Sequence, residues 1–250
     1  MFDMDMVTNS YLVIPDVHGR NFWRSAVKAR ENMDIVFLGD YLDPYRWEGI
    51  SPADATREFK DIIDFKKQHM DNVTLLLGNH DLGYLDPRIN TCRRDRAGAL
   101  ENRNLISDNL ELFDIVRRAS GEGKDILFSH AGVRTAWVES FAGLWGEDGF
   151  NPETLNEWLH SSRDRSCLFR CLASVSYFRG GSWTCGSPVW ADVNEYVKFG
   201  DFLPGCLQVF GHTLHDGGPI HIRGEADEGL CLDCAEAFVL KGDGSLKYPC

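Results

Sequence analysis

Aspartate, histidine and asparagine residues recur directly after short apolar runs along this chain. Asp16 and His18 follow the first run, and because they are two residues apart, both side chains face the same side of an extended segment. Four later segments repeat the arrangement: Gly39-Asp40-Tyr41-Leu42-Asp43, Gly78-Asn79-His80-Asp81, Ser129-His130-Ala131-Gly132 and Gly211-His212-Thr213. Carboxylate and amide oxygens mixed with neutral imidazoles suit Mn, Fe or Zn, whereas calcium sites consist of oxygen ligands alone. Convergence of these ligands would form a two-metal site with a shared carboxylate and ions about 3.5–4 Å apart, which suits phosphoryl displacement.

The apolar runs themselves predict buried strands. They span residues 11–14, 35–38, 73–77 and 126–128. Between them, residues 21–30 and 52–70 carry apolar side chains at helical spacing, and Ser51 before Pro52 is typical of a helix start. Strands that alternate with helices predict a largely parallel sheet, in which a ligand binds beyond the carboxyl ends of the strands.

The second half of the chain has a different character. Residues from about 141 to 200 are rich in aromatic side chains without a clear period, and we interpret them as an insertion in a single domain spanning 1–250. Most of these aromatic residues are expected to form a local hydrophobic core. The runs after the insertion predict antiparallel strands of a second sheet, at 207–210, 220–222, 230–232 and 237–240.

Composition narrows the function further. The chain has 250 residues, 26 Lys and Arg against 38 Asp and Glu, and a net charge of −12, so nucleic acid is an unlikely partner. No apolar run approaches the length of a membrane span, and the acidic amino end differs from a signal peptide, which predicts a cytoplasmic protein that does not bind membranes. Eight irregularly spaced cysteines fit reduced thiols, and Cys231 and Cys234 lie in an apolar run, which indicates packed side chains rather than a zinc site.

Taken in order, the five polar segments resemble the signature of the calcineurin-like metallophosphoesterases. The particular residues in these segments are similar to those of the phosphoprotein-phosphatase branch, which includes Ser/Thr protein phosphatases and diadenosine-tetraphosphate hydrolases. Val189-Trp190-Ala191-Asp192 and Leu230-Cys231-Leu232-Asp233-Cys234 resemble two further elements of that branch. The resemblance implies an α/β fold with a two-sheet β-sandwich flanked by helices (αββα), and it implies that Trp190 lies near the metals.

The resemblance also implies a role for each polar residue. Asp16 and His18 would hold the first metal, with Asp40 as the bridging carboxylate. The ligands of the second metal would be Asn79, His130 and His212. His80 would donate a proton to the leaving oxygen, with Asp43 as the carboxylate that orients it. The expected cofactors are two divalent ions, with manganese expected first, although iron or zinc would accept the same donors.

Two positions depart from the family's pattern. Pro44-Tyr45 stands where protein phosphatases have Arg-Gly, so an arginine that binds the phosphate is missing from its expected place. Arg46 or Arg134 is the expected substitute. The imidazole of His215 lies one residue beyond a second ligand position found in other relatives, which leaves its role as a ligand open. A basic cluster at 93–96 is interpreted as the solvated start of a helix that could also face substrate.

Together these features predict a dimetal phosphomonoesterase in which a metal-bridging hydroxide attacks phosphorus and His80 acts as general acid. The substrate would be a phosphorylated protein, a dinucleoside polyphosphate or another small phosphoester. A metal-dependent phosphodiesterase acting on nucleotides or nucleic-acid ends is an alternative, because a diester needs fewer arginines. A non-catalytic scaffold with the same fold is another, although it would predict eroded ligands.

Overall fold

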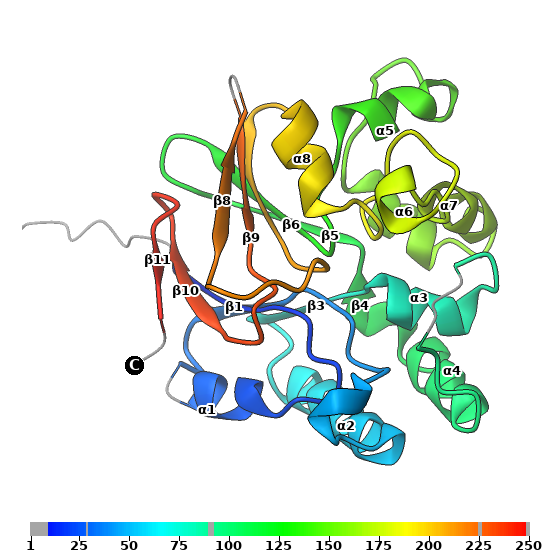
Figure 1. Ribbon diagram of the computed structural model, residues 1–250, viewed down its shortest axis with the longest axis vertical. Helices are drawn as coiled ribbons and strands as arrows, with labels where there is room; N and C mark the ends of the chain where they lie inside the picture. Colours follow the sequence, from blue (N-terminus) through cyan, green and yellow to red (C-terminus); the bar gives the residue numbers. More distant parts are fainter. Residues whose placement is uncertain (1–9, 29, 90–92, 225–226, 249–250) are drawn as a thin grey trace, which may run out of the picture.

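Apolar residues that alternate along the strands form a sandwich of two sheets, shown by the computed structural model in Figure 1. The structure describes residues 10–28, 30–89, 93–224 and 227–248. On the first strand, Tyr11 and Val13 join a buried core that also contains residues of the second sheet. Leu12 and Ile14 point the other way and pack with residues of the outer helices. The predicted α/β sandwich flanked by helices is therefore confirmed.

The first sheet combines parallel strands with an antiparallel edge. Within the described residues its order is β11 (Leu246–Lys247), β10 (Phe238–Lys241), β1 (Ser10–Ile14), β2 (Asp34–Phe37), β3 (Val73–Leu76) and β4 (Phe113–Asp114). The four strands from β1 to β4 run parallel, as predicted for the runs at 11–14, 35–38 and 73–77. The fourth predicted run, at 126–128, instead lies in the second sheet, and the short strand β4, which was not predicted, takes its place. The prediction that the run at 237–240 belongs to the second sheet is wrong, because β10 pairs antiparallel with β1. This pairing covers an edge that would otherwise expose unpaired backbone groups.

The second sheet is also mixed. Its order in the described chain is β5 (Val116–Ala119), β6 (Asp125–Ser129), β7 (Cys206–Phe210), β9 (Glu228–Cys231) and β8 (Ile220–Arg223). Only the β5–β6 and β8–β9 pairs are antiparallel, and β7 runs parallel to both of its neighbours. The expectation of a wholly antiparallel second sheet is therefore wrong. Parallel neighbours need a crossover connection, and the helical segment between β6 and β7 supplies it.

Helices cover the outer faces of both sheets (Figure 1). Helices α1 (Phe22–Lys28) and α2 (Pro52–Gln68) lie on the first sheet. Ser51 caps the start of α2, because its hydroxyl accepts a hydrogen bond from the Asp54 N–H at 3.1 Å. The other helical elements are α3 (Asn79–Leu85), α4 (Ala99–Ser107), α5 (Thr135–Ser140), α6 (Thr154–His160), α7 (Arg165–Leu172), α8 (Val193–Phe199), η1 (Arg46–Glu48), η2 (Leu110–Leu112), η3 (Ala142–Leu144) and η4 (Tyr177–Arg179). Among the described residues, no helix has the length and apolarity needed to cross a bilayer.

The aromatic residues of the crossover pack mainly with one another. The Trp145 ring stacks on Trp158 at 5.5 Å and lies 5.7 Å from Trp137, which is fully buried. The cysteines within the described residues are free thiols, and Cys231 is buried in the second sheet. Burial raises the pKa of Cys234 to about 11, which agrees with packed, unreactive thiols.

Candidate metal centre

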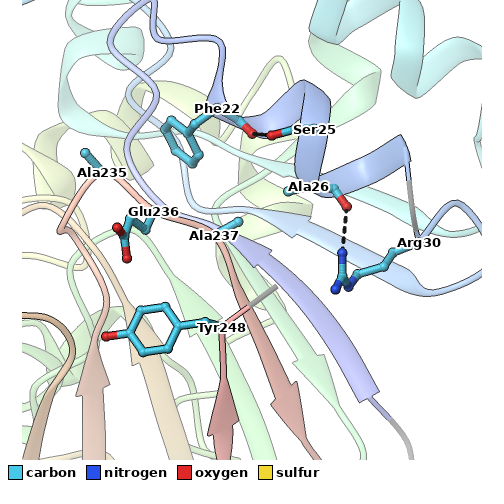
Figure 2. Close-up of a pocket in the computed structure, with 8 residues that line it drawn as sticks. All are labelled: Phe22, Ser25, Ala26, Arg30, Ala235, Glu236, Ala237 and Tyr248. Atoms are coloured by element: carbon cyan, nitrogen blue, oxygen red, sulfur yellow. Dashed lines mark hydrogen bonds between the residues drawn. The ribbon is translucent and has the colours of Figure 1, made fainter. Parts of the chain in front are cut away.

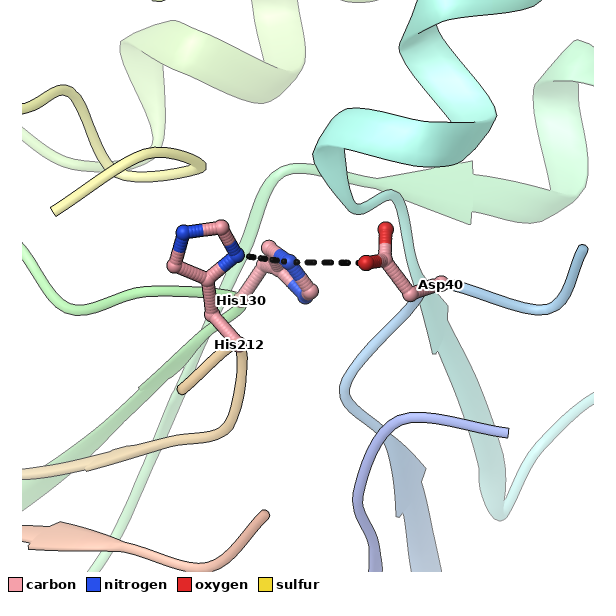
Figure 3. Close-up of side chains that lie close together, drawn as sticks. All are labelled: Asp40, His130 and His212. Carbon is pink, nitrogen blue, oxygen red and sulfur yellow. Dashed lines mark hydrogen bonds and ion pairs between the residues drawn. The ribbon is translucent and has the colours of Figure 1, made fainter. Parts of the chain in front are cut away.

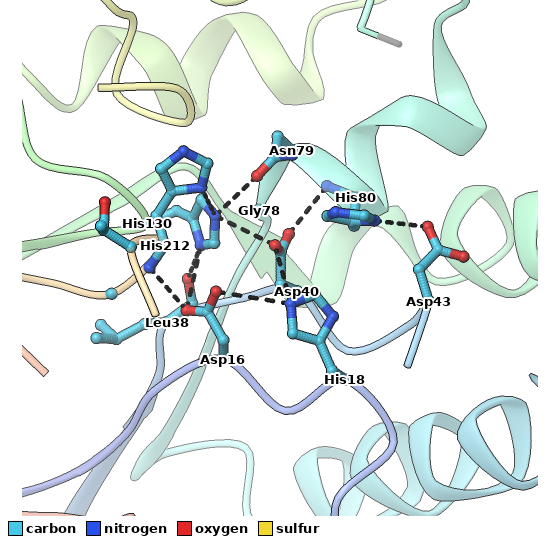
Figure 4. A network of polar contacts seen from close by, with 12 residues as sticks. Asp16, His18, Leu38, Asp40, Asp43, Gly78, Asn79, His80, His130 and His212 are labelled. Carbon is cyan, nitrogen blue, oxygen red and sulfur yellow. Dashed lines mark hydrogen bonds and ion pairs between the residues drawn. The ribbon is translucent and has the colours of Figure 1, made fainter. Parts of the chain in front are cut away.

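The predicted ligands lie at the carboxyl ends of five strands, and the fold brings all six together (Figure 4). Asp16 and His18 follow β1, Asp40 follows β2, and Asn79 begins α3 directly after β3. His130 and His212 follow β6 and β7 of the second sheet. Each of these six side chains is buried, with at most 7% of its surface exposed. The cluster therefore spans the seam between the two sheets.

The ligand atoms form two groups that share one residue. Within the described residues, one group contains Asp16, His18 and Asp40, and the other contains Asp40, His130 and His212. In each group the candidate donor atoms lie within 4.8 Å of one another. Figure 3 shows His130 between His212 and Asp40 in the second group. Asp40 thus occupies the position expected of a carboxylate between two ions.

Backbone carbonyls fix which nitrogen of two histidines faces the cluster. His18 Nδ1 lies 2.7 Å from the Leu42 carbonyl and His130 Nδ1 lies 2.9 Å from the Leu38 carbonyl. A carbonyl can only accept, so each Nδ1 carries the proton and each Nε2 offers its lone pair. The His130 Nε2 then faces two further acceptors, Asn79 Oδ1 at 3.0 Å and Asp40 Oδ2 at 3.5 Å. Acceptors that face one another in this way fit a shared cation.

The pKa shifts of residues in the cluster also favour the binding of cations. Burial lowers the pKa values of His18 and His212 well below the ordinary histidine value, which keeps both imidazoles neutral and able to coordinate. Burial and the negative charge of Asp40 raise the pKa of Asp16 to about 6. The Asp16 Oδ2 atom is buried and has no hydrogen-bond partner among the described residues. The donor set therefore fits two divalent cations, which would neutralise this carboxylate.

Unusual backbone conformations place the site residues. His18, Asp40, Asp43 and His212 have φ values of 45°, 51°, 58° and 68°. This left-handed region is uncommon for residues with a side chain, and such strain clusters at functional sites. Because each of these residues follows a strand, the left-handed conformation turns the chain sharply at the edge where the ligands meet.

Two glycines allow the segments to approach the carboxylates. A Cβ atom on Gly78 would lie 2.1 Å from Asp40 Oδ1, and one on Gly211 would lie 2.3 Å from Asp16 Oδ1. Both distances are far below van der Waals contact, so only glycine leaves room for the ligands. Close packing against the two carboxylates therefore requires glycine at these positions of the motifs.

Asp81 holds two of these segments together, and the sequence analysis assigned it no role. Its carboxylate is fully buried and accepts hydrogen bonds from the N–H groups of Asp40 (2.7 Å), Tyr41 (3.0 Å) and Gly78 (2.9 Å). These bonds fix the loop after β2 against the start of α3. The only sequence signal was its fixed place after Gly-Asn-His, which does not show what it contacts.

The structure places the predicted proton donor beside its predicted partner. His80 Nδ1 lies 2.7 Å from Asp43 Oδ2, and the His80 backbone N–H donates to Asp40 Oδ1 at 2.9 Å (Figure 4). Asp43 is itself held by the Tyr84 hydroxyl at 2.5 Å and the Asp95 N–H at 2.9 Å. A carboxylate on Nδ1 fixes the imidazole ring, so Nε2 is the nitrogen that can exchange a proton with a substrate in the cavity.

Neither arginine expected at the substrate lies there. Arg134 is 3% exposed and forms buried ion pairs with Glu195 and Asp201, so its guanidinium is committed to the protein interior. Arg46 is exposed on η1, and it does not line the cavity over the ligands. His215 belongs to neither ligand group of the described residues, and its backbone N–H donates to the Asp233 carbonyl.

Two other arginines line the cavity, which has a volume of about 220 Å³. Arg93 lies 3.6 Å above the centre of the Tyr45 ring, and its Nη1 donates to the Asp43 carbonyl at 2.6 Å. Its Nη2 is 3.3 Å from the Nε2 atoms of both His18 and His80. The basic cluster at 93–96 is therefore not simply solvated, because Arg93 lines the cavity. It is not the start of a helix either, because α4 begins later, at Ala99.

Arg179 lines the cavity from η4, in the crossover between β6 and β7. Its Nη2 donates to the His212 carbonyl at 3.2 Å and to Thr213 Oγ1 at 2.7 Å, and its Nε lies 2.8 Å from Asp192 Oδ2. Trp190 lines the same cavity, with its ring 5.8 Å from that of His212, as the sequence analysis expected. No spacing rule identifies Arg179, because its place depends on how the crossover folds back.

A second hollow, of about 330 Å³, lies between α1 and the C-terminal strands (Figure 2). Phe22, Ala26 and Tyr248 supply apolar walls, and Arg30 and Glu236 supply charges of opposite sign. None of the predicted ligands lines this hollow, so the chemistry of the protein is placed at the cavity over the metal-ligand cluster.

The fold and this cluster define a phosphoesterase of the dimetal class, and comparison with known proteins supplies the family. The model of the calcineurin-like phosphoesterases matches residues 10–216, and the chain belongs to that family. Members depend on a dinuclear metal centre, and the chain is a metal-dependent phosphoester hydrolase. No curated protein matches the chain in sequence.

Solved structures share the fold over nearly the whole chain. One is a cold-active protein-tyrosine phosphatase of the psychrophile Shewanella sp., with 14% identity, a TM-score of 0.57, and coverage of 97% of this chain and 81% of that one. Another structure of a cold-active protein tyrosine phosphatase has 17% identity, a TM-score of 0.60, and coverage of 96% and 78%. At these identities the likeness shows the shared fold.

Proposed function

We propose that the protein is a phosphomonoesterase that works with two divalent metal ions, manganese in the first instance. Asp16 and His18 would hold one ion and Asp40 would bridge to the other. The second ion would be completed by the remaining ligands, Asn79, His130 and His212. When bound, such ions acidify a water and neutralise charge on a phosphoryl group. The convergence of acceptor atoms described above supports this assignment.

His80 is the proposed general acid. Its Nδ1 faces Asp43, so the Nε2 atom is the one available to protonate the leaving oxygen of the ester. This atom faces the cavity that holds both arginines, where the leaving group would lie. Proton donation by a positioned imidazole is worth about 10²–10⁴ in rate. Asp43 orients the ring through its contact with Nδ1.

Arg93 and Arg179 are proposed to bind the phosphate oxygens, in place of Arg46 and Arg134. They line the same cavity and come from two segments far apart in the sequence, and a phosphate between them could accept hydrogen bonds from both guanidinium groups. Two fixed cations favour the dianion of a monoester over the single charge of a diester. The observation that carries the proposed activity is this pair of arginines over a two-group metal-ligand cluster.

The test compares two substrates of the same leaving group. Protein loaded with Mn²⁺ should hydrolyse p-nitrophenyl phosphate faster than bis-p-nitrophenyl phosphate, and chelation should abolish both activities. Phosphotyrosine and phosphoserine peptides and a dinucleoside polyphosphate would then rank the natural substrate classes. A preference for the diester would overturn the monoesterase assignment and favour the phosphodiesterase. Full metal content without any hydrolysis would favour the non-catalytic scaffold.

A further inference from the structure

A buried ion pair joins Arg134, which precedes α5, to Glu195 on α8. The Glu195 side chain is fully inaccessible, and Arg134 Nη1 donates to its Oε2 atom. Arg134 Nε also donates to Asp201 Oδ1 at 2.8 Å. Removing two charges from water is costly, and such a pair persists only where further hydrogen bonds satisfy the remaining polar atoms.

The other hydrogen bonds that the Glu195 carboxylate accepts from the described residues come from residues 176–192, which we name the wall loop. Oε1 accepts from the Ser176 hydroxyl at 2.5 Å and from the Asp192 N–H at 2.9 Å. Oε2 accepts from the Gly186 N–H at 3.0 Å. One carboxylate therefore holds both ends and the middle of the wall loop.

The wall loop carries two residues of the substrate cavity, Arg179 and Trp190. Arg179 lies three residues after Ser176, and its guanidinium pairs with Asp192. Both Ser176 and Asp192 donate hydrogen bonds to the Glu195 carboxylate. A displacement of the loop would shift the Arg179 guanidinium relative to the metal-ligand cluster. Misplacing a binding group by about 1 Å can cost a large factor in rate.

We propose that the Arg134–Glu195 ion pair positions the wall loop and thereby sets the affinity of the cavity for phosphate, although neither residue touches the substrate. This inference rests on the proposed function, because it assigns Arg179 to phosphate binding. Arg134 and Glu195 are positioning residues in this account. It also explains why an arginine two residues after Gly132 lies in the protein interior and not at the substrate.

The test uses Glu195→Gln in the full chain loaded with Mn²⁺, with inorganic phosphate as the probe. The glutamine keeps the shape of glutamate, but its NH₂ group replaces an acceptor that faces backbone N–H donors. We expect the Kd for phosphate, measured by calorimetry, to rise at least about tenfold with unchanged metal content. Hydrogen exchange measured by mass spectrometry should accelerate in the wall loop and not at residues 78–81.

Two further variants separate positioning from general destabilisation. Lys66→Met removes another buried cation, whose ammonium donates to the carbonyls of Met70 and Val73, so it should lower the melting temperature without changing phosphate affinity. Ser176→Ala removes one hydrogen bond to Glu195 and leaves no unpaired charge. It should fold even if Glu195→Gln does not, and weaken phosphate binding about two- to tenfold.

Unchanged phosphate affinity in Ser176→Ala, or in a folded Glu195→Gln protein, would overturn the inference. Equal weakening of phosphate binding by Lys66→Met would overturn it as well, because the effect would then reflect stability alone. A wild-type protein that binds phosphate but hydrolyses no monoester would contradict the proposed function and leave this inference standing. A wild-type protein that binds no phosphate would contradict both.

Discussion

Replacing His80 with asparagine tests the proposed proton donor without dismantling the cluster. The His80 backbone N–H donates to Asp40 Oδ1 at 2.9 Å, and this bond survives any change of side chain. Asp43 Oδ1 keeps two donors, the Tyr84 hydroxyl and the Asp95 N–H, and the asparagine NH₂ group can replace His80 Nδ1 as the donor to Oδ2. The variant should therefore bind the same amount of metal as the wild type.

The expected loss depends on the leaving group. A positioned general acid contributes about 10²–10⁴ in rate, which corresponds to about 3–5 kcal/mol of transition-state stabilisation. Phenyl phosphate releases a basic phenolate that needs this proton, so its kcat should fall by about that factor. p-Nitrophenyl phosphate releases a stable anion, so its kcat should fall far less. The ratio of the two losses reports on the role of His80 and not on stability.

The assay measures kcat for both esters together with metal content. A matched control is His160→Asn, because His160 also faces an aspartate, Asp114 at 3.6 Å, but does not line the cavity. That variant should retain wild-type rates with both substrates. An equal loss of rate with both esters in the His80 variant, or a loss of metal, would refute the role of His80 as general acid.

Three further outcomes follow from the contacts of the site. Tyr45→Leu should weaken inhibition by phosphate several-fold whereas Tyr45→Phe should not, because the Tyr45 ring, stacked 3.6 Å from the Arg93 guanidinium, and not its hydroxyl holds Arg93. Inhibition constants measured for both variants test this, and equal effects of the two substitutions would contradict it. Asp81→Asn should cost about 1–3 kcal/mol in urea unfolding, since the amide leaves at least one of three backbone donors unpaired. Chelation should lower the melting temperature, because the bound ions offset the charge of buried Asp16, and a scan showing no shift would argue against metal binding there.

The metal-ligand cluster could be predicted because its residues follow strands. Parallel strands present their carboxyl ends at one edge of a sheet, so Asp16, Asp40 and Asn79 had to lie close together once the strands were identified. His130 and His212 come from the second sheet, and their meeting with the first group depended on the packing of the two sheets. The family resemblance supplied that step, which residue spacing alone could not.

Arg93 and Arg179 were not assigned to phosphate binding from the sequence, and the reason is physical. Arg93 lies in the cavity because the segment before α4 docks on Asp43 and Tyr45, and Arg179 lies there because the wall loop folds back onto His212. Both placements depend on tertiary contacts. The basic cluster at 93–96 was expected to be able to face substrate, but no sequence signal pointed to Arg179. Arg134, which lies two residues after Gly132 in the sequence, instead pairs with buried Glu195. Proximity along the chain is therefore a poor guide to the charges that bind a substrate.

Hydrogen bonds involving backbone N–H groups explain how so many acceptor atoms can be held close together. Asp16, Asp40 and the imidazoles would separate if only their mutual repulsion and the strained turns decided their positions. Asp81 holds the backbone of Asp40, the His80 N–H donates to Asp40 Oδ1 at 2.9 Å, and the His212 N–H donates to Asp16 Oδ1 at 2.9 Å. Backbone hydrogen bonds therefore anchor both carboxylates. These bonds hold the candidate ligands in place, and we therefore expect cations to bind with little movement of the chain.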